Sequence, residues 1–438
     1  MQLFQNAARL CWIVLFWGLI LLLLGLSVGS VCALFLWLLD YVTALRFAYP
    51  AILFALPLAG AGVSFLYQRY GSTASGGNNL IIDEIHKPGG GVPFRMAPLV
   101  LFGTVISHLF GASVGREGTA VQVGGSFAAA IGCWFHLGDR GMRLFLMAGI
   151  AAGFGAVFGT PVAGAIFGLE VLTLGRLDYA ALPPVAVASI IADWTCHAWG
   201  IRHAVYHVGF RGVPEADGTI FHVNALLLAK VSIAAICFGL ASRAFASGVH
   251  RMGHIFQKLC PSVVSRSALG GVLTILLVMV LGTRDYLGLG VISSEPGGAS
   301  IMNFFGAAGS YHWSWLWKLV FTLIALGTGF KGGEVTPLFF IGAGLGNALS
   351  PVLGVPTDLL AGIGFVAVFA GAANTPLACT FMSIELFGGA NVVYYTAGCF
   401  IAYFASGHGG IYLSQRIGTP KTFLAQGQAG SALRDFHR

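Results

Sequence analysis

Four glutamates stand within apolar stretches of the sequence, where an ionisable side chain is costly to keep: Glu117, Glu170, Glu334 and Glu385. Carboxylates in such places typically carry protons or face the path of a charged substrate. Glu117 and Glu334 also lie in glycine-rich breaks, and a threonine follows each of them two residues later. These two positions are therefore the first candidates for chemistry inside the protein.

Three glycine-rich breaks interrupt the apolar sequence: Ser75–Asn79 with Gly76 and Gly77, Gly115–Thr119 with Gly118, and Gly332–Thr336 with Val335. The N-terminus of a helix offers unpaired N–H groups and about half a positive charge, and glycine lets its backbone approach a bare anion closely. The breaks therefore predict an anion site made mainly of backbone, with neutral donors from Asn78, Thr119 and Thr336. The plainer alternative for any single break is a tight turn between helices.

Glu117 is placed to act as a gate. At an anion-attracting helix end its carboxylate can take the anion's place when charged and withdraw when protonated, so one residue would gate the path and carry a proton. Glu334 lies beside Thr336 in the same kind of break, and we expect it to share in proton handling. A salt bridge from Glu334 to Lys331 is the alternative role.

One stretch of the first half of the chain recurs in the second half. Phe158–Ala163 is echoed by Ala373–Ala378, and in both copies a glutamate follows the motif's proline after nine residues. The two prolines are 215 residues apart, while Glu117 and Glu334 are 217 residues apart. Two separate pairs thus give nearly the same offset, about half the chain. The shared spacing indicates matching structural roles at helix ends for the two glutamates that follow the prolines.

We therefore expect two homologous helical halves, approximately residues 1–200 and 220–414. An odd number of helices in each half would invert one half relative to the other across the membrane. Inverted halves build a substrate site at the midplane from broken helices whose N-termini face one another. The glycine-rich breaks would then meet at a central anion site.

Composition places these elements in lipid. Of 438 residues, 57% are hydrophobic and only 9% are charged, far below the ~25% of a soluble domain, so a soluble globule is excluded. The first apolar run, Leu10–Leu39, is too long for a signal peptide, and later runs suffice for ten or more segments of ~20 residues. The fold class is therefore an all-α polytopic membrane protein. The net charge of +7 comes from scattered bases, which gives no support to nucleic-acid binding.

The chain as a whole, residues 1–438, is predicted to be one transmembrane domain without an extramembrane regulatory domain. Its last segment, 415–438, carries four bases against one acid, and this bias places the tail in the cytoplasm. The eight cysteines include no Cys-x-x-Cys pair, so we expect small buried residues and no redox site.

Catalytic and metal chemistry find little support. Asp193, Cys196, His197 and His203 are close in sequence, but their spacing matches no zinc signature, and His203 belongs to a polar loop where solvated histidine is ordinary. We expect no metal and no cofactor. An intramembrane enzyme would need a His-Glu-x-x-His or Gly-x-Ser-x-Gly motif, and neither occurs.

The segment Gly115–Gly125 resembles the CLC family of chloride channels and anion/proton antiporters. That family carries Gly-Arg-Glu-Gly-Pro followed by x-Val-Gln-x-Gly-Gly, and Phe158–Glu170 and Gly332–Pro337 echo two further motifs of the family. The resemblance implies eighteen helices in two inverted halves, and a homodimer in which each subunit holds its own anion pore. It also identifies Tyr412 as the counterpart of the inner-gate tyrosine.

The departures from the family pattern resemble its fluoride-exporting clade. Gly76, Gly77 and Asn78 stand where chloride-selective members have Gly-Ser-Gly-Ile-Pro, and Thr119 replaces the proline of the gate motif. Glu334 and Thr336 replace apolar residues beside the central site. Val171 stands at the position of the inner proton glutamate of chloride exchangers, so protons would take another route, and similarity to the clade suggests Glu334.

The sequence therefore predicts a fluoride/proton antiporter of the bacterial inner membrane, with fluoride and protons as its substrates. Fluoride is small, strongly hydrated and a potent hydrogen-bond acceptor, so its site must replace water with donors such as an amide, a hydroxyl and backbone N–H groups. The alternatives with the same fold are a chloride- or nitrate-selective exchanger and an uncoupled anion channel.

Overall fold

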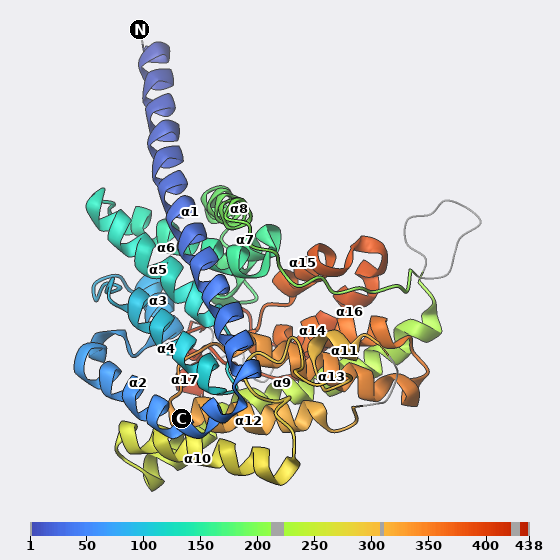
Figure 1. Cartoon of the computed structure of the whole chain (residues 1–438). Helices are drawn as coiled ribbons and strands as arrows, with labels where there is room; N and C mark the ends of the chain where they lie inside the picture. Colours follow the sequence, from blue (N-terminus) through green and yellow to red (C-terminus); the bar gives the residue numbers. More distant parts are fainter. Residues whose placement is uncertain (1, 212–222, 307–310, 422–429, 437–438) are drawn as a thin grey trace.

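The protein is described by a computed structural model that covers residues 2–211, 223–306, 311–421 and 430–436. Helices make up most of it (Figure 1). The one described sheet is a parallel pair of two-residue strands, β1 (Thr173–Leu174) and β2 (Arg416–Ile417). The all-α prediction is confirmed, although a short part of the predicted tail forms this strand. Residues 422–429 and 437–438 of that tail, Arg438 among them, lie outside the described residues.

The helices follow one another in two similar series. The first series is α1 (Gln2–Ala48), α2 (Leu56–Tyr70), α3 (Gly77–His86), α4 (Met96–Phe110), α5 (Glu117–Trp134), α6 (Asp139–Phe158), α7 (Pro161–Glu170) and α8 (Leu182–Ala198). The second is α9 (Ala225–Leu259), α10 (Val263–Leu281), α11 (Ile301–Phe304), α12 (Ser314–Thr328), α13 (Val335–Leu353), α14 (Thr357–Ala373), α15 (Pro376–Phe387), α16 (Val392–Ala405) and α17 (Leu433–Phe436).

The described residues thus form seventeen α-helices rather than the eighteen that the family resemblance implies. Two of them have only four residues, and four further segments are 3-10 helices: η1 (Pro50–Ala55), η2 (Ser72–Ala74), η3 (Tyr179–Ala181) and η4 (Gly389–Asn391). The difference in helix count falls among such short segments, because a 3-10 turn has three residues per turn and often ends without continuing into an α-helix.

The two series pack in the same pattern, as two homologous halves would. In the first, α6 contacts α5, α7 and α8, and α1 lies against α6 and α8; in the second, α14 contacts α13, α15 and α16, and α9 lies against α14 and α16. Glycines bring matching helix pairs into backbone contact. A Cβ added at Gly124 would lie 2.0 Å from the carbonyl oxygen of Gly149, and one at Gly342 would lie 2.0 Å from that of Gly364. The glycine content therefore serves close helix packing.

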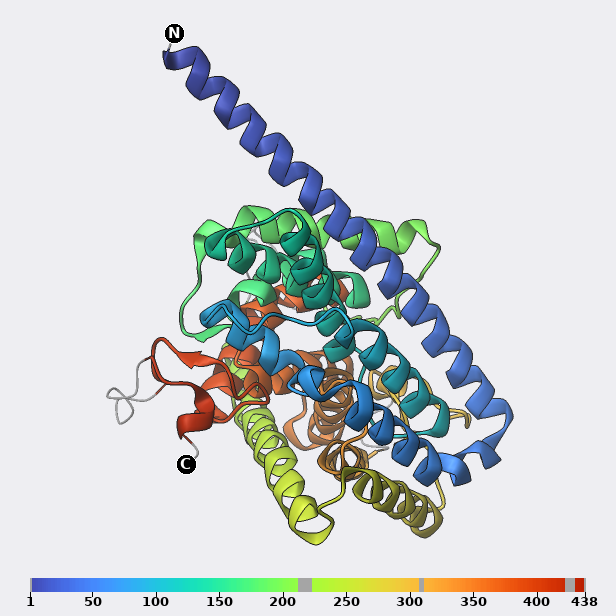
Figure 2. The ribbon, with the colours of Figure 1, turned by 90° about the vertical axis from the view of Figure 1, so that its left-hand side faces the viewer.

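Seven of the described helices are long and apolar enough to cross a membrane, and five more are apolar but have only 10–17 residues. The sequence predicted ten or more spans, so several of them are shorter broken helices. The first span is longer than predicted: α1 has 47 residues, or ~70 Å at 1.5 Å per residue, against a hydrocarbon core of ~30 Å. Its N-terminal part projects beyond the bundle (Figure 2).

The two glutamates that follow the duplicated prolines each cap a helix of the other half. Glu170, at the end of α7, accepts hydrogen bonds from the N–H groups of Leu377 and Ala378, at 3.0 and 2.8 Å. Glu385, in α15, accepts from Val162 and Ala163, at 2.9 and 2.8 Å. The predicted structural role at helix ends is confirmed, and the exchange is reciprocal. Each carboxylate meets the positive end of a helix dipole.

Replacing Glu170 with glutamine is expected to destabilise the protein, because an amide can accept from one N–H group while its own NH2 faces the other. Losing a hydrogen bond to a buried charged acceptor costs about 1–3 kcal/mol. Thermal unfolding of the purified protein should show a lower Tm for Glu170→Gln. The matched control is Glu295→Gln, at an exposed glutamate, and equal melting of the two variants would contradict the capping role.

Candidate functional site

Two of the glycine-rich breaks meet each other inside the protein. Gly115 and Gly333 pair as an isolated antiparallel bridge, with N–H···O distances of 2.6 and 2.8 Å in the two directions. The α5 helix begins two residues after Gly115 and α13 begins two residues after Gly333. The bridge therefore holds two helix N-termini side by side, which is the convergence predicted for an anion site.

This pairing corrects the alignment of the two breaks. The sequence motif matches Glu117 with Glu334 at an offset of 217 residues, whereas the bridge, the helix starts and the glycine contacts at Gly124 and Gly342 all give 218. Glu334 therefore corresponds to Arg116, the residue before its helix, and does not repeat the geometry of Glu117. The mismatch arises because residue identity set the motif alignment, while backbone pairing sets the register in the structure.

The carboxylate of Glu117 lies between the two helix ends and is fully buried. Its Oε2 accepts from the N–H groups of Arg116 and Thr336, at 3.0 and 3.1 Å, and its Oε1 accepts from the Thr336 hydroxyl. The Arg116 guanidinium Nε is 3.9 Å from Oε1. These are the contacts that a small anion would make, so the carboxylate oxygens stand where an anion would sit. We call this position the seat.

A cavity of about 220 Å³ lies on one side of the seat, and we call it the Asn78 cavity. The predicted site residues that line it are Gly76, Gly77, Asn78, Glu334 and Tyr412. Asn78 lies at the N-terminus of α3, the helix that begins within the Ser75–Asn79 break. Its carboxamide faces Gly118, because a Cβ added at Gly118 would be 3.2 Å from Asn78 Nδ2. All three breaks thus supply residues to the seat or to this cavity.

Tyr412 is held by the chain on both sides of it. The N–H of Ile411 donates to the carbonyl of Ala372 at 2.9 Å, and the N–H of Ser414 donates to Asn79 Oδ1 at 3.0 Å. The ring of Tyr412 meets Phe167 edge to face, with centroids 6.4 Å apart. The tyrosine therefore forms a fixed wall between the end of α14 and the start of α3.

Two cavities lie on the Arg116 side of the seat. The Thr336 pocket holds only about 10 Å³ between aromatic walls that include Phe158, Tyr206 and Phe339. The Arg116 vestibule, of about 230 Å³, is lined by three arginines, Arg46, Arg116 and Arg202, and by Asp40. The vestibule is therefore electropositive. The small Thr336 pocket lies between the vestibule and the seat.

Some contacts that the sequence predicted are not found among the described residues. The Thr119 hydroxyl is buried and lies 2.6 Å from the hydroxyl of Thr104, so this geometry gives no support to its role as an anion donor. Val335 contributes the start of α13, and its buried side chain lines none of the three cavities. The Lys331 ammonium lies 4.2 Å from the centroid of the Tyr67 ring, and no ion pair to Glu334 occurs in the described part of the chain.

Several residues that line the cavities have no role that the sequence predicts. Gln122 lines the Asn78 cavity, and Phe158 lines the Thr336 pocket. Both belong to motifs that had already been singled out, so motif membership was a usable signal. Tyr206 and Phe339 follow from no such pattern, because the tertiary fold alone brings their segments to the pocket.

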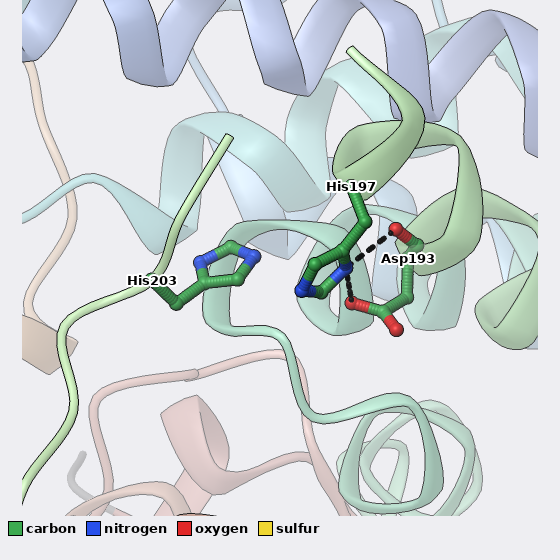
Figure 3. Close-up of side chains that lie close together, drawn as sticks. All are labelled: Asp193, His197 and His203. Carbon is green, nitrogen blue, oxygen red and sulfur yellow. Dashed lines mark hydrogen bonds and ion pairs between the residues drawn. The ribbon is translucent and has the colours of Figure 1, made fainter. Parts of the chain in front are cut away.

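The histidine prediction is wrong in one respect. Asp193, His197 and His203 gather with ligand atoms within 4.8 Å of one another (Figure 3), and His203 is half-buried rather than solvated. Cys196 is buried elsewhere in α8 and is not part of the group.

Substituting Gly333 with alanine is expected to abolish anion flux in liposomes, because the added Cβ would lie 2.7 Å from the N–H nitrogen of Gly118 and force the two helix ends apart. Gly62→Ala is the matched control, since a Cβ there meets nothing within 4 Å. Gel filtration establishes that both variants fold. Wild-type flux through folded Gly333→Ala would show that the close approach is dispensable.

Comparison with known proteins agrees with this architecture. Residues 59–407 match the family described as voltage gated chloride channel. A chloride/fluoride channel protein of Pseudomonas syringae pv. tomato is 48% identical over 405 residues, which cover 91% of this chain and 86% of that protein.

Two crystal structures extend the comparison to the fold. A CLC-type fluoride/proton antiporter superposes with a TM-score of 0.83 at 32% identity, over 92% of this chain and 98% of that one. A slow cyanobacterial Cl⁻/H⁺ antiporter shares the fold, with a TM-score of 0.75 at 20% identity over 89% and 94% of the two chains. The chain is therefore a multi-pass membrane protein that belongs to the CLC family.

Proposed function

We propose that the protein is a fluoride/proton antiporter that exports fluoride, with Glu117 as its gate and proton carrier. The observation that carries the proposal is the carboxylate of Glu117 in the seat, where it accepts hydrogen bonds from Arg116 and Thr336. An anion needs the same donors, so the charged carboxylate and the anion exclude each other. Protonation removes the charge that holds the side chain between the helix ends, and the seat then opens to the anion.

Proton coupling follows from this exclusion. Glu117 leaves the seat only after it has taken up a proton, so anion entry and proton uptake belong to one cycle. Glu334 lines the Asn78 cavity and lies two residues before Thr336, so it is a second carboxylate next to the anion path. We infer that it exchanges the proton with the solution on that side and that, when protonated, it donates to the departing ion.

The donors around the path suit fluoride. The Thr336 hydroxyl, at the seat, and the Asn78 Nδ2 group, which faces Gly118, are both neutral donors. Neutral donors replace water around a strongly hydrated ion without the lasting attraction of a fixed charge. The two similar proteins whose names include fluoride support the same substrate.

We further propose that the protein works as a homodimer in the bacterial inner membrane, with its C-terminus in the cytoplasm. The Asn78 cavity would then face the cytoplasm, because the tail segment that contains β2 lies on the side of Tyr412. The Arg116 vestibule would face the opposite solution. This orientation fits outward fluoride movement against an inward flow of protons.

Proteoliposomes loaded with fluoride test the central proposal. With valinomycin and potassium to balance charge, antiport moves protons inward as fluoride leaves, so a pH electrode outside should record alkalinisation. Passive loss of HF gives the opposite sign. We expect Glu117→Gln to reduce the proton movement to the level of protein-free liposomes, while Glu295→Gln retains it. Persistent coupling in Glu117→Gln would exclude this mechanism, and fluoride flux without any pH change in the wild type would indicate a channel.

Selectivity is expected to depend on Thr336, because its hydroxyl reaches the seat. Replacing it with valine keeps the shape but removes a donor, and an unmet hydrogen bond to a buried anion costs about 1.5–3 kcal/mol, or roughly 10- to 100-fold. The ratio of fluoride to chloride flux should fall by that order in Thr336→Val. Thr274→Val is the control, since that hydroxyl bonds Gly270 of its own helix. Equal fluoride and chloride flux in the wild type would favour a chloride or nitrate exchanger.

A further inference from the structure

Three side chains that could ligate a metal ion lie together beside the Arg116 vestibule. Asp193 and His197 are one turn apart on α8, and His203 comes from the extended segment that follows this helix (Figure 3). Their ligand atoms all lie within 4.8 Å of one another. The Asp193 Oδ1 atom is 3.3 Å from His197 Nδ1, and the rings of His197 and His203 have centroids 5.2 Å apart.

Two polar atoms of this group are left without hydrogen bonds. In the described residues, His203 Nε2 and Asp193 Oδ1 are buried and have no hydrogen-bond partner, although Oδ1 makes the ion-pair contact with His197. A buried polar atom without a partner costs about 1–3 kcal/mol. The fold nevertheless keeps the His203 ring in place, because a Cβ at Gly159 would lie 2.4 Å from its Cδ2 atom. The unpaired Nε2 atom of His203, next to a carboxylate oxygen whose contact is the His197 ring, indicates a missing ligand.

The chemistry of the donors selects the class of ion. Two imidazoles and one carboxylate are a ligand set of zinc and of similar divalent transition metals, whereas calcium and magnesium prefer oxygen ligands. Neighbouring ligands of a tetrahedral ion at ~2.0–2.1 Å are ~3.3 Å apart. The 3.3 Å between Asp193 Oδ1 and His197 Nδ1 already meets this value, and a metal would replace the 3.1 Å contact that Nδ1 also makes with the carbonyl oxygen of Asp193. Movement of the His203 ring toward this pair completes a site with one open position.

We propose that Asp193, His197 and His203 form a binding site for a zinc-like divalent metal ion in the wall of the Arg116 vestibule, and that its occupancy slows transport. Arg116 and Arg202 line the same vestibule and oppose a cation there, so binding depends on the Asp193 carboxylate. Of the three proposed ligands only His203 lines the vestibule itself, and Asp40 is the one acid among the described residues that line it.

The effect on transport, which rests on the proposed function, follows from the position of His203. This residue and Ala204 line both the Arg116 vestibule and the Thr336 pocket. The pocket holds about 10 Å³, which is at most the room for one water molecule, so its wall must move for an ion to pass. A metal that ties His203 to α8 restrains that movement.

Metal binding is tested on the purified full chain after removal of any affinity tag. Cobalt should give the visible absorption of a tetrahedral ion, and zinc should displace it and bind in calorimetry. Asp193→Asn, His197→Gln and His203→Gln should each weaken binding by about tenfold or more. His207→Gln is the matched control, an exposed histidine of the same segment. Absence of the cobalt spectrum, or equal binding by the three variants and the control, would overturn the site.

The transport effect is tested separately in proteoliposomes. Zinc on the vestibule side should slow fluoride efflux from wild-type protein and from His207→Gln, and His203→Gln should lose this sensitivity; magnesium should have no effect. Unchanged flux in zinc-saturated wild-type protein would overturn the restraint on the wall. If the wild type carries chloride in place of fluoride, the fluoride assignment fails, while the cobalt and calorimetry results still decide whether the site exists.

Discussion

The protein depends on the meeting of two helix N-termini at one buried carboxylate. Glu117 would be prohibitively costly in the interior of a membrane protein if it stood alone. Two backbone N–H groups and the Thr336 hydroxyl stabilise it, and the Gly115–Gly333 bridge sets the distance between the helices that supply them. Any side chain at Gly333 would separate those helices. The glycines, the bridge and the glutamate therefore form a single arrangement.

The same principle recurs where the halves join. Glu170 and Glu385 bind the first free N–H groups of α15 and α7, so four donors that a broken helix leaves unpaired find partners in the other half. Short helices can thus end inside the protein without exposing polar backbone to lipid. The stability of the broken helices and the geometry of the anion path have a common physical basis.

Much of the fold and of the site was predictable from sequence, because the motifs that indicate them are local. The offset between the duplicated prolines indicated two halves, and the position of Glu117 in its glycine-rich break indicated that its carboxylate meets a helix end, as it does. The roles of the two threonines could not be separated in this way. Thr119 is the third residue of α5 and Thr336 the second of α13, so their side chains point ~100° apart around the helix axes. Only the tertiary register decides which of them reaches the carboxylate.

The histidine cluster shows a second limit of sequence analysis. His203 is separated from α8 by a turn, and no spacing rule predicts that it folds back toward Asp193 and His197. Its contact with Gly159, at the end of α6, fixes this return. Long-range packing of this kind leaves no periodic trace in a single chain.

The reciprocal helix caps made by Glu170 and Glu385 limit how the two halves can move against each other. Rocking one half against the other would break these four N–H···O hydrogen bonds and both hydrogen bonds of the glycine bridge at once. We therefore infer that the two halves keep their relative positions during turnover. Access to the seat then changes through smaller movements, of side chains and of the pocket wall that carries His203.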